Sequence, residues 1–152
     1  MTHYASVADL EAAIGAPPEK SDWLLIDQDR INRFADATDD HQWIHVDPER
    51  AAAGPFGTTI AHGFLTLSLI SRMLFGITTI ENSPMTINYG LNRVRFLGVV
   101  PVDSRIRASV ELTGSTLVAQ GVRVESTVTI ELEGSDKPAL VAESIALFVL
   151  EK

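Results

Sequence analysis

Residues 63–75 form the stretch GFLTLSLISRMLF. Drawn as a helix, it carries apolar side chains around nearly its whole circumference, namely Phe64, Leu65, Leu67, Leu69, Ile70, Met73, Leu74 and Phe75. A helix that is apolar on all sides is normally buried by the rest of the protein. Because His62 and Arg72 interrupt the wider apolar stretch, it falls short of the roughly 20 apolar residues that a membrane-spanning helix needs. We therefore expect a central helix around which other elements wrap.

The second half of the chain supplies the elements expected to wrap around this helix. Apolar and polar residues alternate over residues 105–112 and again over 122–133, at the period of two that is typical of half-buried strands. Residues 134–138 (GSDKP) predict a turn. Residues 139–149 are apolar on both faces, which favours an inner position in the sheet, and residues 85–96 predict a more polar strand.

The first half predicts short helices and one short strand. Ser6 with Asp9 resembles a capping box that opens a helix ending before Gly15. A strand is expected at residues 23–26, then a helix capped by Asp27 or Asp29 and ending near residues 39–40, and one or two helical turns after Asp47. Helices followed by antiparallel strands indicate an α+β fold, in which a curved sheet surrounds one long helix.

Composition limits the classes of function. The chain has 152 residues and is 45% hydrophobic, which is enough for one core, so we expect a single domain over residues 1–152. A formal charge of -8 disfavours nucleic acid and anionic membrane surfaces as partners. The chain contains no cysteine and no recognisable secretory signal, which predicts a cytoplasmic protein without disulfides.

The densest group of titratable residues lies in the polar segment before the central helix: Asp36, Asp39, Asp40, His41, His45 and Asp47. Asp36 and Asp39 fit a solvated helix end, and Asp47 fits a helix cap before Pro48. A zinc site built from His41, His45 and a carboxylate is disfavoured, because the two histidines lie in a loop rather than on one helical face, so we predict no metal.

Other kinds of catalytic site lack their signatures. There is no Gly-x-Ser-x-Gly elbow, and Ser68 lies inside the apolar helix. The segment GPFG at residues 54–57 lacks the Lys and Ser/Thr of a phosphate-binding loop. A carboxylate and an imidazole five residues apart, Asp40 and His45, can share one water molecule, which favours acid/base chemistry. The sequence does not assign which of the two is the base, since they would titrate as a coupled pair.

Three stretches carry a resemblance to a known family: residues 40–48 (DHQWIHVDP), 54–57 (GPFG) and 60–69 (IAHGFLTLSL). Their residues and spacing resemble the hydratase-2 motif of MaoC-like R-specific enoyl-CoA hydratases, which have the hot-dog fold. The resemblance implies a hydro-lyase that reversibly adds water to a trans-2-enoyl-CoA and forms the R-3-hydroxyacyl-CoA. It implies no cofactor, because coenzyme A enters as part of the substrate.

The resemblance also assigns residues to roles. The family's catalytic aspartate and histidine match Asp40 and His45. Gly63 matches the glycine whose N–H binds the thioester carbonyl, and Ser68 matches a serine that supports the site by hydrogen bonding. Gln42 stands where the family commonly has asparagine, so we expect it at the substrate or its water. His62 is expected to be a helix cap or a core hydrogen-bonding residue.

The resemblance further implies partners and leaves two alternatives open. Trp43 replaces a common proline, and this change is expected to alter the range of acyl chains. The phosphates of coenzyme A need basic residues, and Arg93 and Arg95 are the candidates, with Arg105 and Arg107 as further ones; surface ion pairs are their alternative role. The family usually forms homodimers through sheet edges. A hot-dog acyl-CoA thioesterase and a non-catalytic subunit that binds acyl thioesters are the alternative functions.

Overall fold

The computed structural model describes residues 2–75 and 77–151. Four long strands form most of one antiparallel sheet: β5 (Met85–Phe96), β6 (Ser104–Val118), β7 (Gly121–Leu132) and β8 (Leu140–Val149). The order in this sheet is β2-β6-β7-β8-β5, where β2 is Glu19–Lys20. The strand β3 (Leu24–Ile26) also pairs with β6, at a different part of that strand from β2. As predicted, β8 is an inner strand; β5 forms one edge of the sheet.

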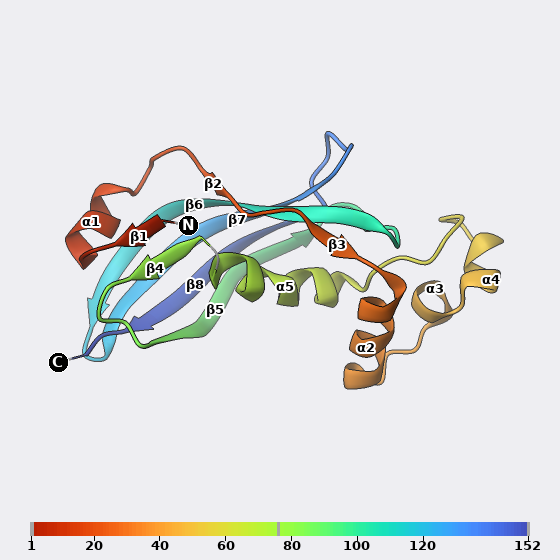
Figure 1. Ribbon diagram of the computed structural model, residues 1–152, viewed down its shortest axis with the longest axis horizontal. Coiled ribbons are helices and arrows are strands. Elements are labelled where there is room, and N and C mark those ends of the chain that lie inside the picture. The colour runs from red at the N-terminus through yellow and green to blue at the C-terminus, as the bar shows by residue number, and fades with distance from the viewer. Residues whose placement is uncertain (1, 76, 152) are drawn as a thin grey trace.

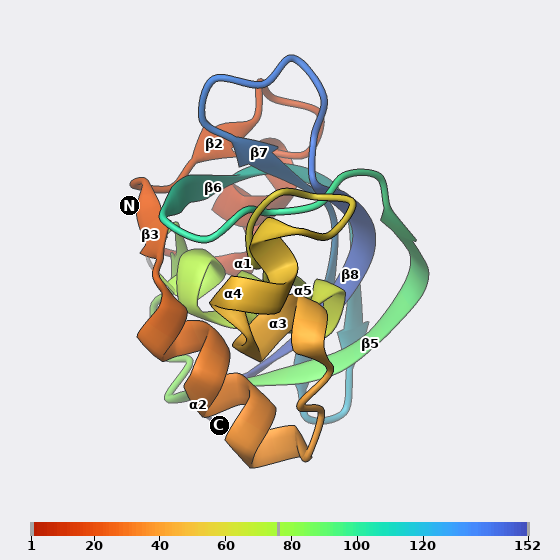
Figure 2. The same cartoon turned by 90° about the vertical axis from the view of Figure 1, so that its right-hand side faces the viewer.

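The predicted central helix is α5 (Gly63–Phe75), and the sheet curves around it (Figures 1 and 2). Leu65, Leu69 and Met73 of α5 are almost fully buried and belong to the main core cluster. Residues from the inner face of the sheet complete this cluster, among them Ile106, Ala108, Val128, Ile130, Leu140 and Ala142. Burial of one helix by a curved antiparallel sheet confirms the expected α+β hot-dog architecture.

A second core cluster lies at the other end of the sheet. It includes Leu10 of α1 (Val7–Ala12), Tyr4 of β1 (Thr2–Tyr4) and Ile80 of β4 (Thr78–Ile80). The predicted N-cap at Ser6 is confirmed, since its Oγ accepts a hydrogen bond from the Asp9 N–H at 3.1 Å. The Asp9 carboxylate accepts from the Ser6 hydroxyl at 2.7 Å rather than from the Ser6 N–H of a full capping box. The parallel pairing of β1 with β4 was not predicted.

Three helices gather near the N-terminal end of α5: α2 (Gln28–Thr38), α3 (Trp43–Val46) and α4 (Pro48–Ala52) (Figure 1). Asp27, one of the two predicted candidates, caps α2 by accepting a hydrogen bond from the Arg30 N–H. Asp47 caps α4 in the same way, as expected, through the Arg50 N–H. In the part of the chain that the structure describes, no helix is long and apolar enough to cross a membrane.

Candidate active site

Asp40 follows directly on the end of α2. Asp39 at the C-cap adopts the left-handed conformation, with φ of 58°, which ends the helix and turns the chain. Asp and Asn tolerate this conformation better than most residues. The Asp40 side chain is 54% exposed, and its carboxylate accepts a long hydrogen bond of 3.4 Å from the Gln42 N–H. The carboxylate therefore lies at the surface of the site, where water can reach it.

His45 lies on the short helix α3 and is only 6% exposed. Its Nδ1 is 2.7 Å from the carbonyl oxygen of Ile60. Because a carbonyl only accepts hydrogen bonds, Nδ1 carries the proton, and in the neutral ring Nε2 is left with a free lone pair. The Ile60 segment is held by two backbone bonds, from the Ile60 N–H to the Ile44 carbonyl and from the Ala61 N–H to the Val100 carbonyl.

Burial lowers the pKa of His45 below its ordinary value of 6.5. The hydrogen bond to the Ile60 carbonyl and the charge of Asp40 act in the opposite direction, and the neighbouring His62 lowers the pKa further. The lowered pKa keeps the ring neutral at pH 7, so Nε2 is available there as a proton acceptor.

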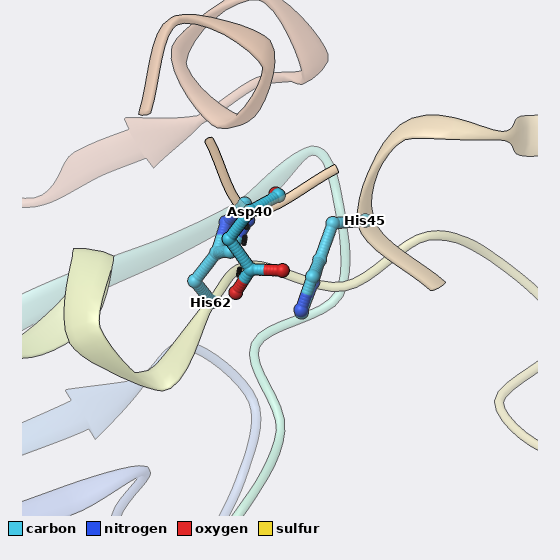
Figure 3. A group of neighbouring side chains, drawn as sticks. All are labelled: Asp40, His45 and His62. Carbon is cyan, nitrogen blue, oxygen red and sulfur yellow. Dashed lines mark hydrogen bonds and ion pairs between the residues drawn. The ribbon is translucent and has the colours of Figure 1, made fainter. Parts of the chain in front are cut away.

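His62 completes a group of three side chains that converge at the N-terminus of α5 (Figure 3). One side-chain donor or acceptor atom from each of Asp40, His45 and His62 lies within 4.8 Å of the others. The imidazole rings of His45 and His62 stack with centroids 3.8 Å apart and planes inclined by 23°. The His62 carbonyl accepts the first helical hydrogen bond of α5, from the Thr66 N–H, which places His62 at the N-cap position.

Gly63 is the first residue of α5. The first N–H groups of a helix have no partner within it and lie at the positive end of the helix dipole. A Cβ atom at this position would lie 3.0 Å from the ring of Phe96, so the site has little room for a side chain. Gly63 therefore presents its N–H next to His62, where it can donate to a substrate oxygen.

The structure does not bring every predicted residue to this group. Ser68 is exposed on α5, and its hydroxyl donates to the Phe64 carbonyl at 2.7 Å, one turn earlier in the same helix. Gln42 is exposed at the N-cap of α3, where its side chain makes no capping hydrogen bond. The substrate-binding roles of both residues remain predictions.

The arginine candidates divide into two pairs. Arg105 pairs with Glu133 at 2.9 Å and Arg107 with Glu131 at 2.7 Å, which is the alternative surface role that the sequence left open. Arg93 and Arg95 lie on the edge strand β5 and are exposed. Among the described residues neither of these two forms an ion pair, so both can bind an anionic group.

Several neighbouring residues have structural roles. His41, a candidate in the zinc site that the sequence disfavours, is exposed and pairs with Asp36 at 2.9 Å; this contact raises the pKa of His41. Sequence reasoning missed Gln28 and Thr59, because neither belongs to a recognisable motif. The Gln28 amide donates to the His45 carbonyl at 2.7 Å, and the Thr59 hydroxyl donates to the Gln28 side-chain oxygen at 2.6 Å. Gln28 thus connects α2 to α3 and to the segment before His62.

The side chains of Asp40, His45 and His62 lie close enough together that a metal ion is the alternative to proton transfer. His62 Nε2 already donates to the Asp40 carbonyl at 2.9 Å, and Nδ1 of His45 is engaged with Ile60. The two stacked rings lie in nearly parallel planes, whereas ligands of a tetrahedral ion converge on one point. This arrangement fits a proton-transfer site better than a metal site.

Comparisons with known proteins identify the family of the chain. The chain is 57% identical to 3-hydroxyacyl-thioester dehydratase Z of Mycobacterium tuberculosis, over 98% of this chain and 99% of that protein. It is 48% identical to nodulation protein N of Rhizobium leguminosarum bv. viciae, over 95% and 92% of the two chains. The structure superposes on the unliganded R-hydratase PhaJ1 from Pseudomonas aeruginosa with a TM-score of 0.74 and 22% identity, over 89% and 83% of the chains. The family model described as MaoC like domain matches residues 9–133, and the chain therefore belongs to the MaoC-like domain family.

Proposed function

We propose that the protein is an R-specific enoyl-CoA hydratase, which adds water reversibly to a trans-2-enoyl-CoA. The observation that carries this proposal is the convergence of Asp40 and His45 next to the exposed first residue of α5, Gly63. The similarity to a protein named as a 3-hydroxyacyl-thioester dehydratase supports it, since hydration and dehydration are the two directions of one reaction.

The reaction begins with the thioester carbonyl bound to the Gly63 N–H. This hydrogen bond draws electron density from the β-carbon and stabilises the developing enolate oxygen. Loss of one such donor typically costs about 3 to 4 kcal/mol of transition-state stabilisation.

Water is held between the carboxylate of Asp40 and Nε2 of His45. His45 takes one proton from the water through its free lone pair while the resulting hydroxide adds to the β-carbon, and Asp40 orients the water by accepting its other hydrogen bond. The proton on Nε2 then passes to the α-carbon, and the enolate returns to a thioester. The net change is one hydrogen at the α-carbon and one hydroxyl at the β-carbon, and His45 ends neutral as it began.

A groove beside α5 offers a place for the acyl chain. It has a volume of about 210 Å³ and lies between α5 and strands β5 and β8, lined by Leu67, Ser68, Ile70, Ser71, Asn88 and Leu91. Predominantly apolar walls with a few polar groups are typical of small-molecule sites. Ser68 lines this groove, which supports the role that we predict for it in binding the substrate.

The remaining partners follow from the same proposal. Arg93 and Arg95 are proposed to bind the phosphates of coenzyme A, since both are exposed and free of ion pairs among the described residues. The active form is proposed to be a homodimer in the cytoplasm, acting as one domain without metal or cofactor. The cysteine-free sequence and the exposed edge strand β5 support this assignment.

The test is the loss of conjugated-enoyl absorbance when the purified protein is incubated with crotonyl-CoA. Wild type is expected to consume the substrate without releasing free thiol, whereas a thioesterase would release thiol and a non-catalytic subunit would do neither. Asp40→Asn and His45→Gln are expected to lower kcat by at least about 100-fold. His41→Gln is the matched control, because His41 lies in the same segment but pairs with Asp36 at the surface.

A further inference from the structure

His62 is the buried titratable group that the proposed reaction does not use. It is 3% exposed, and its two ring nitrogens have different surroundings. Nε2 lies 2.9 Å from the backbone carbonyl of Asp40, and Nδ1 is buried with no hydrogen-bond partner in the described part of the chain. Because a carbonyl only accepts, Nε2 carries a proton and donates it to the Asp40 carbonyl.

The ring of His62 also contacts two other rings. It stacks on the ring of His45, with the centroids 3.8 Å apart. Its centroid lies 5.0 Å from that of Phe34.

We infer that His62 is a positioning residue. Its Nε2 holds the backbone carbonyl of Asp40 and its ring restrains the ring of His45, so that Asp40 and His45 can both hydrogen-bond to the same water molecule. Asp40 needs such support, because its side chain is half exposed and its carboxylate makes two long contacts: a hydrogen bond of 3.4 Å from the Gln42 N–H and an approach of 3.9 Å to His62 Nε2. His45 needs it because, although Nδ1 is fixed by Ile60, rotation about that bond changes the direction of Nε2 unless a neighbour restrains the ring plane.

His62 also helps to position Gly63, whose N–H is proposed to bind the thioester oxygen. Its carbonyl accepts the first hydrogen bond of α5, and the next residue is Gly63. One residue therefore sets the relative placement of the water-binding pair and of the oxyanion donor. A misplacement of reacting groups by about 1 Å can cost about 100-fold in rate, so the restraint has catalytic consequences.

Two variants separate the two contacts of His62, and the inference rests on the proposed hydratase activity for their readout. His62→Phe keeps an aromatic ring against His45 but loses the donor to Asp40. His62→Gln keeps an amide donor but loses the ring. Both are expected to lower kcat on crotonyl-CoA by about 10- to 100-fold with KM changed less than about 3-fold, while the thermal midpoint of each stays near that of wild type. His41→Gln, in the same segment, is expected to leave kcat unchanged.

Kinetics overturn the inference if His62→Phe and His62→Gln both keep kcat near wild type. They also overturn it if kcat falls only in proportion to a loss of folded protein, because that result marks a purely structural residue. If the wild-type protein is inactive, the proposed function is contradicted instead. The position of His62 is then tested by a second measurement, which needs no activity.

That second measurement is ¹⁵N NMR of the four histidine rings in the wild-type protein at pH 7, which also covers the case of variants that do not fold. The inference predicts a His62 ring with a proton on Nε2, donated to the Asp40 carbonyl, stacked on a His45 ring with its proton on Nδ1. A His62 that carries its proton on Nδ1 and none on Nε2 would show that its ring does not donate to the Asp40 carbonyl, and it would overturn the inference.

Discussion

At the scale of single residues, one hydrogen bond determines what His45 can do. The Ile60 carbonyl fixes the ring proton on Nδ1, and burial lowers the pKa of the ring. At neutral pH, Nε2 therefore carries a free lone pair that can accept a proton in the site. Asp40 by contrast is accessible to solvent. The two groups therefore have different environments, which is the usual way in which an enzyme assigns distinct roles to an acid/base pair.

The lowered pKa of His45 predicts the pH dependence of activity. We expect kcat/KM for crotonyl-CoA to be lost on the acidic side with an apparent pKa below 6.5, because protonation of Nε2 removes the base. His41→Gln should leave this limb in place, since the pKa of His41 is raised and its ring lies elsewhere. An acidic limb above 6.5 would contradict the role given to His45.

The same shift predicts a stability effect with a definite sign. The folded-state pKa of His45 lies below the unfolded value of about 6.5, so the unfolded chain binds more protons between these two values. The free energy of unfolding should therefore fall as pH decreases from about 6.5 through the folded pKa. Urea unfolding of wild type and His45→Gln at pH 7 and at lower pH measures it, and the fall should be smaller in the variant.

Gly63 is constrained by space as well as by chemistry. In Gly63→Ala the new Cβ would meet the Phe96 ring at 3.0 Å, so the start of α5 must shift by a few tenths of an ångström or the ring must move. We expect kcat to fall about 10-fold through displacement of the N–H. Combining Gly63→Ala with Phe96→Leu should restore most of the activity, and failure to restore it would show that the lack of space at Phe96 is not the cause.

At the scale of elements, the position of α3 depends on a residue from α2. The Gln28 side chain donates to the His45 carbonyl and accepts from Thr59, which is 1% exposed. Gln28→Ala leaves the buried Thr59 hydroxyl without its partner, and we expect a loss of about 1 to 3 kcal/mol in the free energy of unfolding together with a lower kcat. Arg33→Ala, on the exposed face of the same helix, is the control, and a change below about 0.5 kcal/mol is expected there. Equal effects of the two variants would contradict the role given to Gln28.

The sequence predicted the long elements well and the short ones poorly, for physical reasons. The central helix and β5 were predicted at their observed bounds, because both are long and have clear patterns. The helix α3 was missed because it has only four residues and no side-chain cap at Gln42. The strand β6 continues to Val118, beyond the predicted end at residue 112, because a register shift between Leu112 and Gly114 breaks the alternation.

Some residues of the candidate site could be predicted from the sequence and others could not. Asp40, His45 and Gly63 were predicted from a local motif, and the structure brings them to one end of α5. The Ile60 carbonyl and Gln28 could not be predicted, because backbone carbonyls carry no sequence signal and Gln28 acts across 17 residues of chain. The two are nevertheless what fixes the tautomer and the position of His45.

At the scale of the whole molecule, the first half of the edge strand β5 exposes large apolar side chains. These are Met85 (50%), Ile87 (40%) and Tyr89 (56%). Proteins normally protect such an edge with charge or cover it, since it presents unpaired backbone groups and apolar side chains to other chains. This strand therefore suits the edge-to-edge homodimer that we propose.

The proposed dimer is tested by one lysine on this edge. Wild type is expected to have the mass of two chains by light scattering after gel filtration, and Ile87→Lys is expected to shift it toward one chain. Leu117→Lys, at an exposed apolar residue near the end of β6, is the matched control and should remain dimeric. A monomeric wild type would contradict the proposed assembly.

Asp40 and His45 are proposed to act on one water molecule held between them, and the configuration of the product is the sharpest test of this role. Crotonyl-CoA is incubated with wild type, Asp40→Asn and His45→Gln, and the 3-hydroxybutyrate released from the product is resolved by chiral chromatography. Wild type is expected to give the R enantiomer alone, and the two variants are expected to give at most traces of it. An S or racemic product, or an R product formed as fast by either variant as by wild type, would contradict the account.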